Sequence, residues 1–258
     1  RFGCCFSILV TGSNRGIGLE LVRQLAASPQ APQHIFATCR DPDGLSGKAL
    51  RKLAARHPSI KLVQLVSLPS IQGAVQAVES HLKGQGLNLL INNAGVSSHA
   101  TLQSVDSQEM LSAFTTNVIG APVSLCQEFL PLLEKAAKGL GKEGLSCSRA
   151  AIINVSTKVG SIGLCLGMLE APMYPYRASK AAQNMMTRCM AAELKDKGIL
   201  CTAIHPGWVK TDMGTEKVLC RAPLTVEHSV RGILTVLASL SQDTTGAFLD
   251  WEGNSVPW

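Results

Sequence analysis

The sequence predicts one α/β domain with a doubly wound Rossmann fold, a mainly parallel sheet with helices on both faces. Short apolar runs alternate with longer segments whose apolar residues recur at helical spacing. The short runs are apolar throughout, which indicates strands covered on both faces. The first run leads through a glycine-rich turn into a helix. With no internal repeat or linker, we assign residues 1–258 to a single domain.

The predicted elements follow from these runs in chain order. Helical spacing is clear after the first strand, where Ile17, Leu21, Val22 and Leu25 share a face. The strands are expected at Cys5–Thr11, His34–Cys39, Ile60–Val66, Leu87–Ile91, Ala150–Val155 and Leu200–Ile204. The helices are expected at Ile17–Ala27, Leu45–Arg56, Ile71–Leu82, Leu111–Leu133 and Ala178–Leu194. Lys138–Ser148 is predicted as a surface loop, Gly160–Met173 as an irregular apolar stretch, and Lys210–Pro223 as a lobe over a pocket.

Composition excludes several classes of protein. A hydrophobic content of 46% with 16% charge excludes a disordered chain. The net charge of +6 comes from scattered Lys and Arg residues, so no nucleic-acid partner is expected. No apolar stretch is long enough for a membrane span. The nine cysteines show no C-x-x-C spacing, which favours free thiols in a reducing compartment, taken as the cytoplasm, over disulfides or a metal site.

The glycine-rich turn is the first candidate binding site. It comprises Gly12, Ser13, Asn14, Arg15, Gly16, Ile17 and Gly18 and lies between a strand and a helix. Glycine allows a tight turn and close approach to a diphosphate, and the helix N-terminus offers free N–H groups. The alternative is a tight strand–helix turn with no ligand. The position between strand and helix favours a dinucleotide site.

The tip of the second strand bears on which dinucleotide binds. An NAD site places an acid here to accept from the ribose 2′-hydroxyl. In this chain Cys39 is at the tip and Arg40 follows, and a guanidinium suits the 2′-phosphate of NADP. Arg15 could reach the same phosphate. Alternatively, both arginines are solvated, and Asp41 pairs with Arg40 or serves the ribose. We favour NADP.

Tyr176 and Lys180 form the candidate acid/base pair. They are four residues apart, so on a helix they share a face. The other tyrosine, Tyr174, has Ala178 at that spacing. A nearby ammonium favours phenolate and lowers a tyrosine pKa, which suits proton transfer at a reacting oxygen. The alternative is an ordinary exposed pair.

Three further polar positions lie where parallel strands end or inside a helix. Ser156 follows the strand Ala150–Val155, where its hydroxyl could bond a substrate carbonyl, although it or Thr157 could simply cap a turn. Asn92–Gly95 follows the fourth strand. Asn117 falls in a helical pattern that asparagine disfavours, which indicates a polar role inside the fold.

Together these residues resemble the short-chain dehydrogenase/reductase family. Thr11–Gly18 is similar to its T-G-x-x-x-G-x-G turn and Asn92–Gly95 to its N-N-A-G segment. Asn117, Ser156, Tyr176 and Lys180 match its catalytic set, and Pro206-Gly207 with Thr211 match its nicotinamide-contacting stretch. Thr38-Cys39-Arg40 and Tyr174-Pro175-Tyr176-Arg177 resemble the branch of sniffer-like and C-factor-like carbonyl reductases.

The resemblance implies the roles of these residues. Tyr176 would donate a proton to the carbonyl oxygen, Lys180 would bond the nicotinamide ribose and lower the tyrosine pKa, Ser156 would orient the carbonyl, and Asn117 would hold a relay water. NADPH would supply the hydride to a small ketone, aldehyde or quinone. The helices around Leu111–Leu133 and Ala178–Leu194 could pair subunits into a homodimer or homotetramer. Besides the glycine turn, Arg40, Tyr176 and Lys180, the cofactor contacts would be Asn93, Ala94, Gly95, Pro206, Gly207, Val209 and Thr211.

Two departures from the family pattern leave alternatives open. Ser67 stands where the family usually has an adenine-contacting Asp. The interval from Ser156 to Tyr176 is longer than usual, which puts the substrate in doubt. One alternative is a catalytically weak protein that senses NADP(H) or signals. Another is a dehydrogenase for a steroid, retinoid or acyl substrate, which the apolar stretches Gly160–Met173 and Lys210–Pro223 permit.

Overall fold

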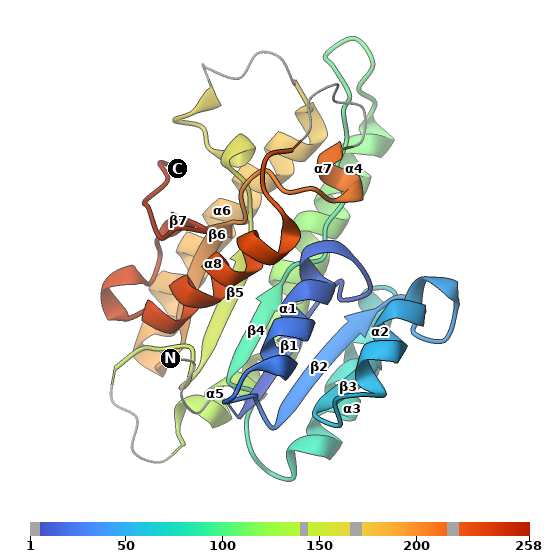
Figure 1. Cartoon of the computed structure of the whole chain (residues 1–258). Coiled ribbons are helices and arrows are strands. Elements are labelled where there is room, and N and C mark those ends of the chain that lie inside the picture. Colours follow the sequence, from blue (N-terminus) through green and yellow to red (C-terminus); the bar gives the residue numbers. More distant parts are fainter. Residues whose placement is uncertain (1–5, 140–143, 166–171, 216–221) are drawn as a thin grey trace.

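The computed structural model describes residues 6–139, 144–165, 172–215 and 222–258. Within these ranges seven parallel strands form one sheet in the order β3-β2-β1-β4-β5-β6-β7 (Figure 1). The strand order reverses between β1 and β4, and in open α/β sheets that is where ligands bind. The strands are β1 (Ser7–Val10), β2 (His34–Cys39), β3 (Ile60–Gln64), β4 (Leu89–Asn92), β5 (Ala151–Val155), β6 (Leu200–His205) and β7 (Phe248–Asp250).

Helices cover both faces of the sheet, which confirms the doubly wound Rossmann architecture. One face packs against α1 (Gly16–Ala27), α2 (Lys48–Ala54) and α8 (Val226–Ser239). The other packs against α3 (Ile71–Leu82), α5 (Cys126–Ala137) and α6 (Tyr174–Leu194). The remaining helices are α4 (Ser107–Phe114), the π-helix η3 (Thr115–Leu125), α7 (Asp212–Thr215) and the 3₁₀ turns η1 (Leu45–Gly47), η2 (Leu68–Ser70), η4 (Lys158–Gly160), η6 (Lys195–Lys197) and η7 (Gln242–Thr244).

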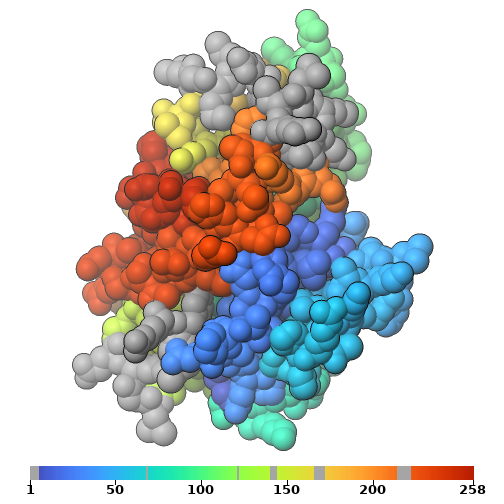
Figure 2. All heavy atoms as spheres, viewed as in Figure 1, coloured from blue at the N-terminus to red at the C-terminus, as the bar shows by residue number. Residues whose placement is uncertain are grey.

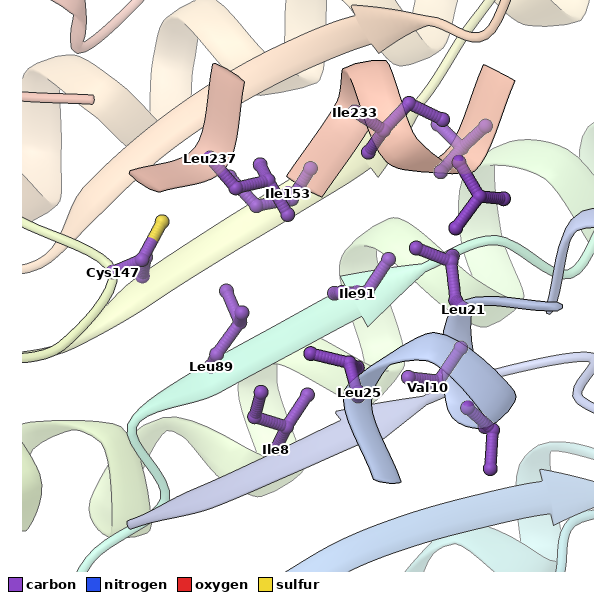
Figure 3. Close-up of a cluster of buried hydrophobic side chains, with 14 of the residues drawn as sticks. Ile8, Val10, Leu21, Leu25, Leu89, Ile91, Cys147, Ile153, Ile233 and Leu237 are labelled. Atoms are coloured by element: carbon purple, nitrogen blue, oxygen red, sulfur yellow. The ribbon is translucent and has the colours of Figure 1, made fainter. Parts of the chain in front are cut away.

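Successive side chains of a strand point to opposite faces of the sheet, so each apolar strand contributes to two hydrophobic cores. In β1, Ile8 and Val10 face the α1/α8 side, whereas Leu9 faces the α3/α5 side. Figure 3 shows the first of these cores, where side chains of β1, β4 and β5 meet those of α1 and α8. Atoms of α8 lie directly against those of α1 on the face shown in Figure 2. The two cores together bury the central strands, whose side chains point alternately to the two faces of the sheet.

Several element boundaries differ from the sequence predictions. The predicted helix Leu111–Leu133 runs from Ser107 to Ala137 and is a π-helix in its middle, where Pro122 has no N–H to donate. The predicted helix Leu45–Arg56 begins as a 3₁₀ turn and ends at Ala54. The helix expected from Ala178 begins at Tyr174.

Other differences concern the loops and the C-terminal part. Neither β7 nor α8 was predicted. In the predicted lobe Lys210–Pro223, residues 212–215 form α7. Positions 216–221 of that lobe, 166–171 of the stretch Gly160–Met173 and 140–143 of the loop Lys138–Ser148 lie outside the described residues. No helix in the described ranges has both the length and the apolar character needed to span a membrane.

A single buried asparagine fixes the end of the sheet opposite the glycine turn. The Asn88 Oδ1 atom accepts hydrogen bonds from the backbone N–H groups of Phe6 and Ser7 at 3.0 and 3.1 Å. Its Nδ2 group donates to the backbone oxygens of Ser148 and Arg149 at 3.1 and 2.9 Å. Asn88 therefore joins the chain segments that enter β1, β4 and β5.

We predict that Asn88→Ala lowers the free energy of unfolding by about 3 kcal/mol, because it removes the hydrogen bonds that this buried side chain makes to the chain segments that enter β1 and β5. Urea denaturation followed by circular dichroism measures this change. Asn254→Ala is the matched control, since Asn254 is exposed and its side chain donates one bond of 3.4 Å, to Asp250. Equal free energies of unfolding for the Asn88 and Asn254 variants would contradict a stabilising role for the hydrogen bonds of Asn88.

Candidate active site

The loops that follow β1 and β4 are hydrogen-bonded to each other at the switch point of the sheet. The Thr11 Oγ1 atom accepts from the backbone N–H groups of Asn93 and Ala94, each at 2.9 Å. The Asn93 Nδ2 group donates to the Thr11 oxygen at 2.9 Å and to the Gly12 oxygen at 3.3 Å. Two predicted parts of the cofactor site, about eighty residues apart in sequence, thus form one unit.

The glycine turn has a shape that only glycine allows. Gly12 and Gly16 have φ values of +65° and +53°, in the left-handed region. A Cβ atom on Gly18 would lie 2.2 Å from the Gly12 oxygen. Ser13 supports the turn, because its Oγ donates to the Val10 oxygen at 2.7 Å. Asn14, which is half-buried, has its Nδ2 group 3.5 Å from the Ser46 oxygen.

The N-terminus of α1 is open to an anion. The helix has no side-chain cap and no acidic residue in its first turn. Its first N–H groups therefore lack the acceptors that usually satisfy a helix start. These groups and the helix dipole favour a negatively charged ligand. Ile17 and Gly18 lie in this first turn. The turn and the helix start together fit the diphosphate of a dinucleotide.

Near the tip of β2, Asp41 and Arg15 each bond a residue other than Arg40. The Asp41 carboxylate accepts from the Gly44 N–H at 2.9 Å, so it closes its own turn, and in the described part of the chain it forms no ion pair with Arg40. The Arg40 side chain is exposed. Arg15, which the sequence analysis placed near the same phosphate, forms a 2.8 Å ion pair with Asp212 of α7. Of the two arginines, Arg40 is the one that forms no ion pair in the described part of the chain.

Tyr176 and Lys180 lie on one face of α6, as the spacing predicts. The Lys180 Nζ atom is 5.9 Å from the centroid of the Tyr176 ring. It donates to the Val155 backbone oxygen at 2.8 Å and to the Gln183 Oε1 atom at 2.8 Å. The lysine is buried, with 4% of its surface exposed. The alternative of an ordinary exposed helical pair is thus wrong.

Burial controls the protonation of both groups. It raises the pKa of Tyr176 to about 12 and lowers the pKa of Lys180 to about 7, because each charged form loses its water. The direction for Tyr176 is opposite to the sequence expectation that Lys180 lowers it. The sequence pattern showed a neighbouring ammonium but not the depth of burial. The phenol is therefore protonated at neutral pH, the form that donates a proton.

Ser156 is held from the α6 side rather than used as a cap. Its backbone N–H donates to the Ile204 oxygen at 2.8 Å, and its Oγ donates to the Asn184 Oδ1 atom at 2.6 Å. Asn184 is fixed in turn, because its Nδ2 donates to the Gly160 oxygen at 3.3 Å. Thr157 is the cap of the following 3₁₀ turn. The capping alternative for Ser156 is therefore wrong.

Asn117 connects the loop after β4 to α6. Its Oδ1 accepts from the Val96 N–H at 2.9 Å, and its Nδ2 donates to the Val96 oxygen and to the Ser179 Oγ atom, both at 2.9 Å. A Cβ atom on Gly95 would lie 3.1 Å from Asn117 Oδ1 and 3.7 Å from Lys180 Nζ. The structure thus brings Asn117, Gly95 and Lys180 together, as the motifs predict.

The segment after β6 closes over the glycine turn. Gly207 has a φ of +87°, and a Cβ there would lie 2.6 Å from a methyl carbon of Leu224. Pro206 accepts at its oxygen from the Ser229 hydroxyl at 2.5 Å. Val209 is buried and forms a bridge with Leu224. The Thr211 methyl carbon would be 3.4 Å from a Cβ on Gly16. The predicted nicotinamide segment therefore adjoins the diphosphate turn.

Sequence reasoning missed three residues of this site. Ser179, Gln183 and Asn184 bond Asn117, Lys180 and Ser156, respectively, and all three are buried on α6. Their polar side chains on the Lys180 side of a helix were the available signal. In the described ranges, no three His, Cys, Asp or Glu side chains gather as a metal site would require.

Comparison with known proteins agrees with this geometry. The model of the short chain dehydrogenase family matches residues 7–219. The NADPH-bound carbonyl reductase from chicken fatty liver is 48% identical, with a TM-score of 0.93, over 99% of this chain and 100% of that one. The carbonyl reductase Sniffer of D. melanogaster is 39% identical, with a TM-score of 0.90, over 98% and 99%. The C-signal protein of Myxococcus xanthus is 36% identical over 67% of this chain and 93% of its own length. The chain belongs to the short-chain dehydrogenase family of oxidoreductases.

Proposed function

We propose that this protein uses NADPH to reduce a ketone or aldehyde to the alcohol, or a quinone to the hydroquinone. One observation carries the proposal: Asn117, Ser156, Tyr176 and Lys180, which come from three separate parts of the chain, are brought together by α6. Asn117 bonds Ser179, Ser156 bonds Asn184, and the Lys180 Nζ atom lies 5.9 Å from the centroid of the Tyr176 ring. The NADPH-bound carbonyl reductase that is 48% identical supports it. A panel of carbonyl compounds assayed by the loss of NADPH absorbance tests it.

The residues of the site fit the proposed cofactor. The glycine turn and the uncapped start of α1 would hold the diphosphate, and Arg40 would pair with the 2′-phosphate. Gly95 leaves room beside Lys180, whose Nζ has one N–H left after its two hydrogen bonds and would donate it to a ribose hydroxyl. When bound, NADPH supplies the hydride.

The protein's own part in the reaction is proton transfer and positioning. Tyr176 is half-buried and its pKa is raised, so it is protonated at neutral pH, and it donates its proton to the carbonyl oxygen as negative charge develops there. Ser156, fixed by Asn184, sets where that oxygen lies. Asn117 fixes the loop after β4 against α6 and keeps the approach to Lys180 open.

A second candidate is NADP(H) sensing or signalling with little turnover, and two observations favour it. One relative is the C-signal protein. Ser67 replaces the adenine-contacting Asp, and its backbone N–H is already donated to the Ser70 hydroxyl at 3.0 Å. Tight NADPH binding without turnover of any carbonyl in the panel would overturn the reductase proposal and support this one.

The substrate class and the assembly are also proposals. Leu102, Ile162 and Trp208, on loops after β4, β5 and β6, expose much of their apolar surface, which supports an apolar carbonyl and permits a steroid, retinoid or acyl substrate. Exposed Leu111, Ile119 and Met185 would suit a homodimer or homotetramer. Free thiols suit the cytoplasm.

We predict that Tyr176→Phe lowers kcat by about 10³-fold, because the proton donor is lost, while NADPH binding changes little. Steady-state kinetics and NADPH fluorescence titration measure the two effects. Tyr174→Phe is the matched control, because Tyr174 is the other tyrosine and is exposed, and it should keep parental activity. Parental turnover in Tyr176→Phe would move the proton donor elsewhere.

We predict that Arg40→Ala weakens NADPH binding by about 30-fold and NADH binding by much less, because a charge-assisted bond to the 2′-phosphate is lost. Titration with each nucleotide measures both dissociation constants. Arg56→Ala, an exposed arginine just beyond α2, serves as the control. If both nucleotides lose the same affinity, Arg40 does not bind the phosphate.

A further inference from the structure

We propose that Gln183 is a positioning residue that fixes the ammonium of Lys180 and maintains the positive charge beside Tyr176. This inference rests on the proposed function, since it assigns Gln183 a role through the Tyr176–Lys180 pair. Gln183 is not part of any motif that identified the site in the sequence. Gln183 would determine how strongly the positive charge of Lys180 acts on the Tyr176 phenol.

The contact itself is short and buried. The Gln183 Oε1 atom accepts from Lys180 Nζ at 2.8 Å, and 1% of Gln183 is exposed. An ammonium has three N–H groups. The Val155 oxygen takes a second one at 2.8 Å. With two of its three N–H groups held from fixed points on β5 and α6, the third has a defined direction.

Gln183 is itself held by a buried polar series below the site. Its backbone oxygen accepts from the Thr187 hydroxyl at 2.9 Å, and that hydroxyl accepts from Asn154 Nδ2 at 2.9 Å. The Asn154 Oδ1 atom accepts from Asn92 Nδ2 at 2.8 Å. The series links α6 to β5 and β4. The helix turn that carries Gln183 is therefore fixed to the strands whose ends form the site.

The two acceptors of Lys180, the Val155 oxygen and Gln183 Oε1, are both neutral, and their neutrality affects Tyr176. An amide oxygen stabilises the ammonium but leaves its charge uncompensated, so the charge still acts on Tyr176. A carboxylate in the same place would stabilise the ammonium more and also cancel its effect on the phenol. Burial already lowers the pKa of Lys180 to about 7, so its charged form near neutral pH depends on such acceptors.

The other charged groups on α6 and on the elements packed around it either have partners of their own or are exposed. Neither β5 nor η3 contains an ionisable residue. His205 of β6 stays neutral, because burial lowers its pKa to about 4. Four charged side chains make other contacts: Lys158 of η4 with Asp250 of β7, Glu109 of α4 with Ser98, Arg177 of α6 with Cys165, and Arg188 of α6 with the Gly246 oxygen. Glu193 of α6 and the charged residues Lys195–Lys197 of η6 are exposed. Gln183 is therefore the side chain whose replacement changes the surroundings of Lys180 most directly.

Gln183→Glu and Gln183→Met test the inference in the full-length protein. The measurements are the pH–rate profile of alcohol oxidation with NADP⁺, kcat and KM for reduction, and thermal melting. Because burial lowers the pKa of Lys180 to about 7, the pH–rate profile should follow the titration of Lys180 near neutral pH. In Gln183→Glu the added carboxylate stabilises the ammonium and should move that titration about one pH unit higher. In Gln183→Met the lost acceptor should lower kcat/KM about tenfold.

The controls separate the possible failures. Gln76→Glu and Gln76→Met on α3 make the same changes at an exposed glutamine and should match the parent. A parental pH profile in folded Gln183→Glu with parental kcat/KM in folded Gln183→Met would overturn the inference. If one variant fails to fold, the other decides alone. If Tyr176→Phe is active, the proposed function is overturned. If Tyr176→Phe is inactive but both Gln183 variants behave like the parent, only the role of Gln183 is overturned.

Discussion

The arrangement of the site depends on the burial of the central strands of the parallel sheet. Helices cover both faces, so the central strands present apolar side chains almost everywhere along their length. Polar groups can meet a ligand only where the strands end. The reversal of strand order between β1 and β4 brings the glycine turn and Asn92–Gly95 to one edge, and the Thr11 hydroxyl joins them by accepting two backbone N–H groups.

One helix then organises the chemistry at that edge. Along α6, Tyr176 and Lys180 face the site, while Ser179 and Asn184 hold Asn117 and Ser156 in place by hydrogen bonds. Because this face is buried, the phenol keeps its proton and the ammonium loses part of its preference for charge. The electrostatics of the pair are therefore a consequence of packing, and the neutral acceptors around Lys180 adjust them.

The sequence predicted the parts of the fold that local patterns determine. Six strands follow from apolar runs and the candidate catalytic positions from motifs, but β7 has three residues, too few to show a period. The ion pair of Arg15 with Asp212 joins residues that lie far apart in sequence. The pKa of Tyr176 was predicted in the wrong direction, since spacing along a helix does not reveal burial. Gln183 was missed because a polar residue on a helix usually faces solvent.

The central claim is that this site delivers a hydride from NADPH to the carbonyl carbon while the protein supplies the proton. Following the label from NADPH deuterated at C4 of the nicotinamide tests it most directly. With a ketone that the enzyme turns over, mass spectrometry should find one deuterium on the carbinol carbon of the product and none on oxygen after exchange in water. NADPH is labelled separately at each of the two hydrogens on C4. If neither labelled form gives deuterium in the product alcohol, direct hydride transfer from NADPH is contradicted.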